Sequence, residues 1–473
     1  MQRLLTLFAF LLTLTTLQAT DQQSTSRRTK YKDGPAYIYR VALADKQGTS
    51  YSLDHPMRFL SRRSVERRKR QGLSVDSTDL PVSPQYVNLL CREGVSIVGQ
   101  SRWQNTVLLR MSDTTRIANI RQLPCVRNCK LVWLSPDSVA YENRSKYNEH
   151  FEELDSVIGE LYGAAAEEIQ VLQGVRLHKI GLLGQNMMIA VLDGGFKNAD
   201  RIPEFQKIDI RGYHDFVDPA QPRLFSETDH GSKVLSAMAI YHPYYFIGTA
   251  PKASYWLLRS EDQQTEQEVE EDYWTMAAEY ADSVGCDVIN SSLGYNEYDH
   301  KWMRFPLWHL DGRTAFVSRS ASMLADKGIV LVNSAGNSGM SSWKKISVPA
   351  DADNILTVGA VADMDAHRIA PFSSVGPAQD GRVKPDVVAI GAPARLVSAR
   401  GTITSGMGTS FSSPIVCGLV ACLWQAMPHK TAREIIELVR QNSDNYGHPD
   451  NIYGYGLPNF WKAYMMGKIE TKN

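Results

Sequence analysis

Ser410 is of a residue type that can act as a nucleophile, and it stands where a helix is expected to begin. It lies in the stretch GTSFSSPIVCG, ahead of an apolar, helix-like segment at residues 411–427. Pro414 is expected in the first turn, where a missing N–H costs least. Free N–H groups and the positive dipole end at a helix start would stabilise an anionic adduct on this serine. A serine there is also an ordinary helix N-cap, so Ser410 needs partners to become a nucleophile.

Three residues that precede Ser410 in the chain, Asp193, His230 and Asn337, are suitable partners for it. His230, in DHGSKVLSAMA, is a base that can take the proton of a serine hydroxyl, and the glycine after it lets another group approach closely. Asp193 ends the apolar run MMIAVLD and can hold a histidine in the required tautomer. Asn337 closes VNSAGN, and its amide can donate to an oxyanion beside the N–H of Ser410. Taken singly, each is also an ordinary strand-end, loop or turn residue.

The segments that carry these residues predict an α/β fold. Continuous apolar runs, typical of parallel strands buried on both faces, occur at residues 187–193, 253–260, 286–294, 328–337 and 354–361. Helix-like stretches lie between them at residues 231–240, 268–284 and 314–327. This alternation predicts a doubly wound, mainly parallel sheet. Active sites of such sheets gather at the carboxyl ends of strands, where Asp193, Gly294 and Asn337 fall.

A smaller α+β domain of two layers is predicted at residues 36–139. Its strands are expected at 36–43, 95–101, 105–111 and 129–136, and its helices at 56–72, 83–94 and 113–124. The arginine-rich part of the first helix, residues 62–70, is expected to be a solvated face, with a processing site as the alternative. The polar stretch 140–161 is the best domain boundary, followed by a large domain at 162–467 and a tail at 468–473.

Composition and the N-terminus indicate an exported protein. The chain has 51 lysines and arginines against 51 acidic residues among 473, which gives no sign of a nucleic-acid partner. Residues 1–19 have the features of a signal peptide: Arg3, then an apolar segment at 4–17, then a small residue, Ala19. Residues 20–35 are a polar leader. No later run approaches the roughly 20 apolar residues of a membrane span, so we expect a secreted protein, extracellular or periplasmic.

The six cysteines fit an exported protein but define no metal site. Cys125 and Cys129 are the best candidate disulfide pair, since they would close a small loop. Cys286, Cys417 and Cys422 lie in apolar stretches and are at least as well explained as buried thiols. No spacing of cysteines and histidines is typical of a zinc site.

The order Asp193, His230, Ser410 is that of subtilisin-type catalytic triads, and it differs from the orders in chymotrypsin and in α/β-hydrolases. Residues 162–467 resemble the subtilisin-like serine peptidases (subtilases) over nearly their whole length. The matching pieces are IAVLDGGF, DHGSKVLSAM, GTAPKASYWLLRS, DVINSSLGY, VNSAGN, FSSVGP, KPDVVAIG, GTSFSSPIVCG and YGYGLPNFWKA. The resemblance implies that these three residues form a triad and that Asn337 is the oxyanion amide. It also implies two substrate-binding edges, formed by Ser291, Ser292, Leu293 and Gly294 and by Ser334, Ala335 and Gly336.

What the resemblance implies for function is a secreted serine endopeptidase (EC 3.4.21) that is made as a precursor and acts on polypeptides. The domain at 36–139 would then be a propeptide and intramolecular inhibitor, with a permanent binding domain as the alternative. An inactive peptide-binding relative and a processing protease of narrow specificity are the alternative functions. No cofactor is required for the chemistry; subtilases often bind calcium, but no ligand spacing assigns a site here.

Two positions depart from the usual pattern of the family, and one stretch is ambiguous. Gly194 stands where the family usually carries serine or threonine, and Lys233 where it usually carries a second histidine. Neither position carries the proton transfer, so activity is expected to survive.

The acidic stretch 261–272 could line the cleft and favour basic side chains or bind a cation, but acids favoured at a helix N-terminus are the preferred explanation. The two edges at residues 291–294 and 334–336, which the resemblance places around the P1 pocket, carry no obvious charge, and this favours uncharged P1 residues.

Overall fold

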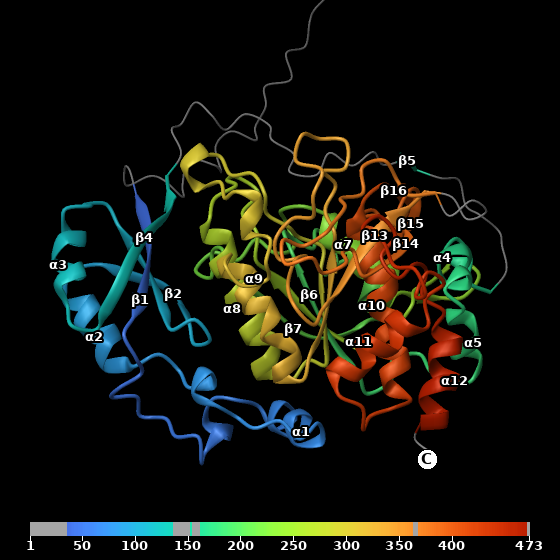
Figure 1. Cartoon of the computed structure of the whole chain (residues 1–473), viewed down its shortest axis with the longest axis horizontal. Helices are drawn as coiled ribbons and strands as arrows, with labels where there is room; N and C mark the ends of the chain where they lie inside the picture. The colour runs from blue at the N-terminus through green and yellow to red at the C-terminus, as the bar shows by residue number, and fades with distance from the viewer. Residues whose placement is uncertain (1–35, 136–151, 154–160, 363–367, 471–473) are drawn as a thin grey trace, which may run out of the picture.

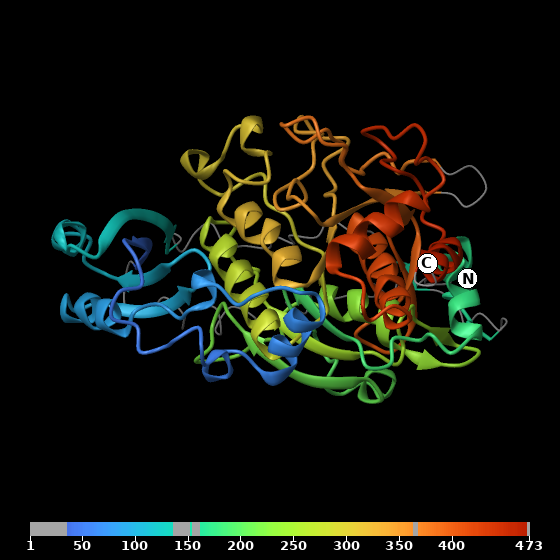
Figure 2. The same cartoon turned by 60° about the horizontal axis from the view of Figure 1, so that its bottom comes forward.

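The structure is a computed structural model that describes residues 36–135, 152–153, 161–362 and 368–470. The described chain forms a small domain (residues 36–135) that lies against one side of a larger one (residues 161–470), as Figures 1 and 2 show from two directions. The predicted signal peptide, the leader and most of the predicted domain boundary lie outside the described residues. No helix in the described ranges is both long enough and apolar enough to cross a membrane.

A seven-stranded sheet forms the centre of the large domain. Its order is β14-β13-β12-β11-β6-β10-β7, and every neighbouring pair is parallel. The strands are β6 (Met188–Asp193), β7 (Asp209–Asp215), β10 (Ser254–Arg259), β11 (Val288–Ser291), β12 (Val330–Ser334), β13 (Leu356–Val361) and β14 (Val387–Ile390). The five predicted strands are confirmed. The apolar-run signal misses two strands: β7, which is a half-exposed edge strand, and β14, a short buried strand at the other edge of the sheet.

Helices cover both faces of this sheet, which confirms the doubly wound arrangement. The helices α7 (His230–Ala239) and α10 (Thr409–Gln425) pack on one face, and α8 (Val269–Val284) and α9 (Phe316–Ser322) on the other. Successive side chains of β6 alternate between the two cores, as a period of two requires: Ile189 faces α10 and Ala190 faces α8. The remaining helices of this domain are α4 (Ala166–Val171), α5 (Gly174–Lys179), α6 (Pro203–Gln206), α11 (Ala432–Gln441) and α12 (Phe460–Glu470).

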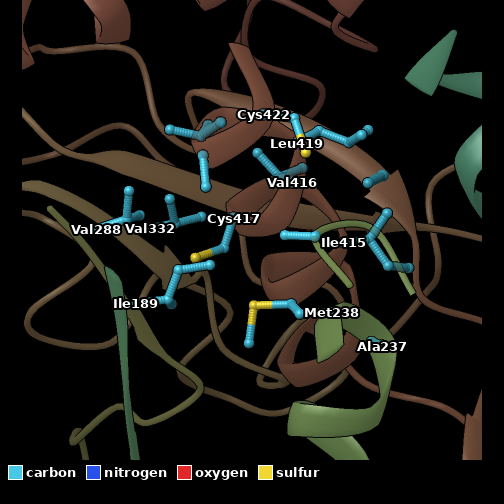
Figure 3. Close-up of a cluster of buried hydrophobic side chains, with 14 of the residues drawn as sticks. Ile189, Ala237, Met238, Val288, Val332, Ile415, Val416, Cys417, Leu419 and Cys422 are labelled. Carbon is cyan, nitrogen blue, oxygen red and sulfur yellow. The ribbon is translucent and has the colours of Figure 1, made fainter. Parts of the chain in front are cut away.

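The helix that carries Ser410 is buried over almost its whole length. Figure 3 shows side chains of α10, among them Val416 and Cys417, in one cluster with Ile189 and Val332 of the sheet. Such a helix needs no amphipathic face of its own, because it is surrounded by apolar side chains. The packing therefore fixes the position of Ser410 relative to the strands.

The helix α10 begins earlier than the sequence suggests. Gly408 is its N-cap and Thr409 its first residue, so Ser410 lies inside the first turn and Pro414 in the second turn, not the first. Proline has no N–H and cannot donate to the carbonyl of Ser410, four residues before it. The hydroxyl of Ser292 donates to that carbonyl instead, at 2.8 Å. A residue of the predicted substrate edge thus replaces the missing helix bond.

The small domain confirms the predicted two-layer fold and order of elements. Its antiparallel sheet has the order β2-β3-β1-β4. The strands are β1 (Tyr37–Leu43), β2 (Ser96–Ser101), β3 (Thr106–Met111) and β4 (Val126–Leu134), and the helices are α1 (Arg62–Arg70), α2 (Pro84–Arg92) and α3 (Arg116–Gln122). One face of the sheet packs on α2 and α3. The other face, with Ile38 and Trp133, shares a core with Trp274 of α8.

The predicted helix 56–72 is broken into a short 3-10 turn (Pro56–Arg58) and α1, which Ser61 caps by accepting a hydrogen bond from the N–H of Ser64. The expectation of a solvated basic face is wrong for two residues of α1. Arg67 and Arg68 are almost fully buried, with 0% and 1% exposure, and both pair with Asp282 of α8. Buried charges persist in proteins when they are paired, and these partners lie more than 200 residues away along the chain. A local pattern could not reveal them.

Smaller sheets complete the fold. A hairpin of β15 (Ala394–Val397) and β16 (Ile403–Gly406) precedes α10, and β5 (Glu152–Glu153) pairs antiparallel with β16. The strands β8 (Tyr241–His242) and β9 (Phe246–Ile247) form a separate pair. The short strand β5 therefore adds to the hairpin that leads directly into the helix of Ser410.

The suggested disulfide between Cys125 and Cys129 is not formed, and all six cysteines are free thiols. Cys129 lies inside β4 and Cys125 immediately before it. Four residues of extended chain span roughly 13 Å, whereas disulfide-linked Cα atoms lie about 4.4–6.8 Å apart. The strand therefore keeps the two sulfur atoms apart.

Candidate active site

The strand β6 and the helix α7 bring Asp193 and His230 into contact. Both side chains are buried, Asp193 as the last residue of β6 and His230 as the first of α7. The Nδ1 atom of His230 donates to both carboxylate oxygens, each at 2.9 Å. This contact assigns the proton to Nδ1 and makes Nε2 the basic nitrogen.

The glycine after His230 has the predicted role in close packing. A Cβ atom at Gly231 would lie 2.4 Å from the carbonyl oxygen of Gly195 and 2.9 Å from Cβ of Asp193. No larger residue fits without moving backbone. Gly231 therefore allows α7 to start directly against the end of β6.

The carboxyl of Asp193 is in a low-dielectric environment with compensating partners. Burial raises its pKa, while the His230 ring and the N–H of Gly194, which donates at 2.8 Å, act in the opposite direction. The negative charge of Glu261 raises the pKa of Asp193 further. The net result is a raised pKa for Asp193, and the contact with His230 is the largest of the effects that favour its ionised form. The carboxylate in turn stabilises a positive charge on the ring.

Ser410 lies close to this pair but does not share a hydrogen bond with it in the described structure. The ring of Phe411, the next residue, has its centroid 5.7 Å from that of His230. The hydroxyl of Ser410 donates to the carbonyl of Ser292 at 3.4 Å. A rotation about χ1 of Ser410 would redirect its hydroxyl, and catalytic hydrogen bonds are often long or poorly aligned without substrate.

Asn337 presents its amide beside Ser410 because Thr409 occupies its oxygen. The Oδ1 atom of Asn337 accepts from the N–H of Thr409 at 3.0 Å and from the hydroxyl of Thr409 at 2.9 Å. The Nδ2 group is then the donor available on this side chain. Thr409 was not predicted as a site residue, although it stands next to Ser410 in the sequence.

Ser410 and Asn337 border a cavity of about 200 Å³. Five of the seven residues predicted to bind substrate also line it: Ser292, Leu293, Gly294, Ser334 and Gly336. The two edges approach each other across Ser347. A Cβ atom at Gly294 or at Gly336 would lie 2.9 Å from an atom of Ser347, and Gly336 has a φ of +105°. Glycine at both positions therefore keeps the cavity open.

The other two predicted substrate residues face away from the cavity. The hydroxyl of Ser291 accepts a hydrogen bond from Nε1 of Trp274 at 2.9 Å, on the α8 side of the sheet. Ala335 is fully buried in the same core. Because neighbouring residues of an extended chain point in opposite directions, Ser292 and Ser334 point toward the cavity instead.

Two carboxylates, Glu261 and Glu266, also line this cavity. The segments at residues 291–294 and 334–336 are uncharged as expected, but these two residues come from outside them and give the cavity negative charge. For Glu261 and Glu266, the explanation that the stretch 261–272 lines the cleft therefore holds. Farther along the stretch, Glu271 accepts from the N–H of Val317 and Asp272 pairs with Arg40. The sequence alone does not separate these roles, because residues 261–268 form a loop without periodicity.

The two departures from the family pattern have local explanations. The N–H of Gly194 donates to Asp193, a bond that needs no side chain. The ammonium of Lys233 pairs with Asp229 at 3.0 Å, and both line a separate cavity with Arg400. The described residues hold no group of three or more histidine, cysteine, aspartate or glutamate side chains placed to hold a metal ion.

A histidine–aspartate pair, a serine at a helix start and an amide donor, all at the carboxyl edge of a parallel sheet, are the equipment of a serine hydrolase. Sequence comparison gives the particular family. The model of the subtilase family, Peptidase S8, matches residues 184–456, which is more than half of the chain, and the chain belongs to this family. The model of the Peptidase S8 propeptide domain of Bacteroidota matches residues 38–152.

Named relatives agree with this assignment. M-protease of Shouchella clausii (strain KSM-K16) is 27% identical over 329 residues, which cover 69% of this chain and 77% of that protein. Subtilisin BL of Lederbergia lenta is 28% identical over 292 residues, 62% of this chain and 95% of that protein. Serine protease AprX of Bacillus subtilis (strain 168) is 32% identical over 197 residues, 37% of this chain and 41% of that protein. The chain is a subtilisin-like serine endopeptidase, a hydrolase of class EC 3.4.21, made as a precursor.

Proposed function

We propose that the protein is a secreted endopeptidase that cleaves polypeptides through Asp193, His230 and Ser410 and an acyl-enzyme. The observation that carries the proposal is the 2.9 Å contact between His230 Nδ1 and Asp193, beside the cavity that Ser410 and Asn337 border. The predicted signal peptide at residues 1–19 supports secretion. Membership of the subtilase family supports the same chemistry.

In the proposed reaction, Nε2 of His230 takes the proton of Ser410 as its oxygen bonds to the peptide carbonyl carbon. The oxyanion that forms accepts hydrogen bonds from the N–H of Ser410 and from Nδ2 of Asn337. Protonated His230, stabilised by Asp193, then gives its proton to the leaving amine as the C–N bond breaks. Water, activated by the same nitrogen, hydrolyses the ester on Ser410 and restores the enzyme.

Substrate would bind as an extended strand along the edges at residues 292–294 and 334–336, since main-chain hydrogen bonds hold an added strand and cavities read its side chains. The cavity between the two edges would receive a side chain next to the scissile bond.

The small domain would assist folding and block the cleft until it is cleaved. Its strand β4 ends at Leu134, which exchanges two hydrogen bonds of 2.9 Å with the side chain of Gln267. Gln267 belongs to the same loop as the cavity residues Glu261 and Glu266, so β4 ends at the rim of the cleft. Sequencing the N-terminus of secreted protein tests this role. A mature start between residues 140 and 163 supports a propeptide, whereas a start near Thr20 supports a permanent binding domain.

A serine-directed phosphonate tests the catalytic proposal. We expect it to label the mature wild type and not Ser410→Ala. Failure to label folded, mature wild type would leave an inactive peptide-binding relative as the function. Cleavage-site profiling on a peptide library then separates a general protease, with a broad profile, from a processing protease with a narrow motif.

A further inference from the structure

We propose that the cavity beside Ser410 selects substrates with a lysine or arginine side chain next to the scissile bond, and that Glu261 and Glu266 read this cation. The inference rests on the proposed function and adds the substrate class to it. It reverses the expectation of an uncharged P1 residue.

The fold brings Glu261 to the catalytic edge of the sheet. It follows β10 by two residues, and Arg259, the last residue of β10, is in register with Asp193 of β6. Glu261 is buried, with 5% exposure, and it lines the same cavity as Ser410 and Asn337. Its charge acts on the Asp193 carboxyl, which is an independent sign of its closeness to the reaction centre.

Glu266 is held on the opposite part of the same loop by backbone bonds. Its N–H donates to Oδ2 of Asp299 at 3.0 Å, and its carbonyl accepts from the N–H of Asp299 at 2.8 Å. It borders both the cavity at Ser410 and an adjoining cavity of about 450 Å³, which Arg304 also lines. Because Arg304 offsets part of the charge there, we expect Glu261 to contribute more than Glu266 to selectivity.

The rest of the wall favours a long cationic side chain over an apolar one. Apart from Leu293 the lining is small or polar, and a volume of about 200 Å³ accommodates one long side chain. The two carboxylates give this wall a negative charge, which favours a cation over an apolar group of similar size. A guanidinium or ammonium supplies the opposite charge and can form charge-assisted hydrogen bonds.

Fluorogenic peptides that differ only next to the scissile bond test the proposal on the mature enzyme. We expect kcat/KM for lysine and arginine to exceed that for norleucine and glutamine by about ten- to a hundredfold, the range of a charge-assisted hydrogen bond. In Glu261→Gln and in Glu266→Gln the ratio of kcat/KM for the lysine and arginine peptides to that for the norleucine peptide should shrink, and it should shrink more in Glu261→Gln. Both changes preserve side-chain size.

Glu297→Gln is the matched control, because Glu297 is exposed and borders the adjoining cavity but not the one at Ser410. Its preference should equal that of the wild type. A wild type that favours norleucine, or an unchanged preference in both glutamate variants, overturns the inference.

Phosphonate labelling of each sample keeps the two proposals apart: unlabelled wild type contradicts the proposed function, whereas labelled enzyme without basic preference contradicts only this inference. If the phosphonate does not label Glu261→Gln, the peptide preference of Glu266→Gln alone decides whether the inference holds.

Discussion

Single hydroxyl and amide groups around Ser410 fix the geometry that the proposed chemistry needs. Ser292 donates to the carbonyl that Pro414 leaves without a helix bond, and Thr409 donates twice to Asn337. Motif spacing was sufficient to find Ser410 and Asn337, because both stand in short, distinctive strings. It could not find the supporting role of Ser292, which depends on a contact between residues 118 positions apart.

Asn337→Ala should lower kcat about a hundred- to a thousandfold with little change in KM, the size known for the oxyanion asparagine of subtilisin itself. The reason is that an oxyanion donor acts mainly in the transition state. Thr409→Val removes one of the two bonds that orient Asn337, so its loss of kcat should be smaller. Steady-state kinetics on one peptide measure both. A rise in KM at constant kcat would instead make Asn337 a ground-state binding residue.

Glu168→Gln should make stability less dependent on pH. Glu168 of α4 is buried, its Oε1 accepts from the N–H of Arg395 at 2.7 Å, and burial raises its pKa to about 7. The folded state keeps its proton up to that pH, whereas the unfolded chain loses it near pH 4.5. The stabilisation is therefore complete below pH 4.5 and is lost as pH rises through 7, by roughly 3 kcal/mol.

Urea unfolding in a Ser410→Ala background, which prevents self-digestion, measures this effect. Glu168→Gln, neutral at every pH, should match the parent at pH 4.5 and exceed it in unfolding free energy at pH 8. Parallel pH profiles of the two proteins would show that the Glu168 carboxyl is ionised in the folded state at neutral pH.

Among the elements, α8 joins the two domains through buried hydrogen bonds and ion pairs. Its last turns carry Glu279, which accepts from the hydroxyl of Ser101 and from the N–H groups of Arg102 and Trp103, and Asp282, which pairs with Arg67, Arg68 and Arg102. Burial opposes the charge of Asp282, but the three arginines outweigh it and hold the pKa well below its usual value. The element itself was predicted from its helical pattern, but its partners lie in another domain.

Asp282→Asn should destabilise the precursor by about 3–5 kcal/mol, because it leaves buried guanidinium groups without their counter-charge. Chemical unfolding of the Ser410→Ala precursor measures the difference. Glu66→Gln is the matched control on α1, since its pair with Arg62 is exposed and such pairs contribute only a few tenths of a kcal/mol. Equal stability of Asp282→Asn and the control would contradict a structural role for this cluster.

For the molecule as a whole, the sequence sufficed to predict two domains, their order and their fold classes. Alternating apolar runs identify the parallel strands, because both faces of the sheet are buried. The docking of the domains was not predictable, since it depends on ion pairs between distant segments such as Arg40 with Asp272. The position of the acidic loop at residues 261–268 was not predictable for a related reason. The loop has no hydrophobic periodicity, so its place at the cleft depends on the strands that flank it.

Although arginines of α1 pair with carboxylates of α8, the net charges of the two domains are opposite. Residues 36–135 contain 16 lysines and arginines against 7 acidic residues, a net charge of +9, whereas residues 162–473 contain 28 against 35, a net charge of −7. The neutral precursor is therefore an electrostatic dipole. Separating its halves would yield a polycation and a polyanion that attract each other at low ionic strength, and raised salt would hasten their parting.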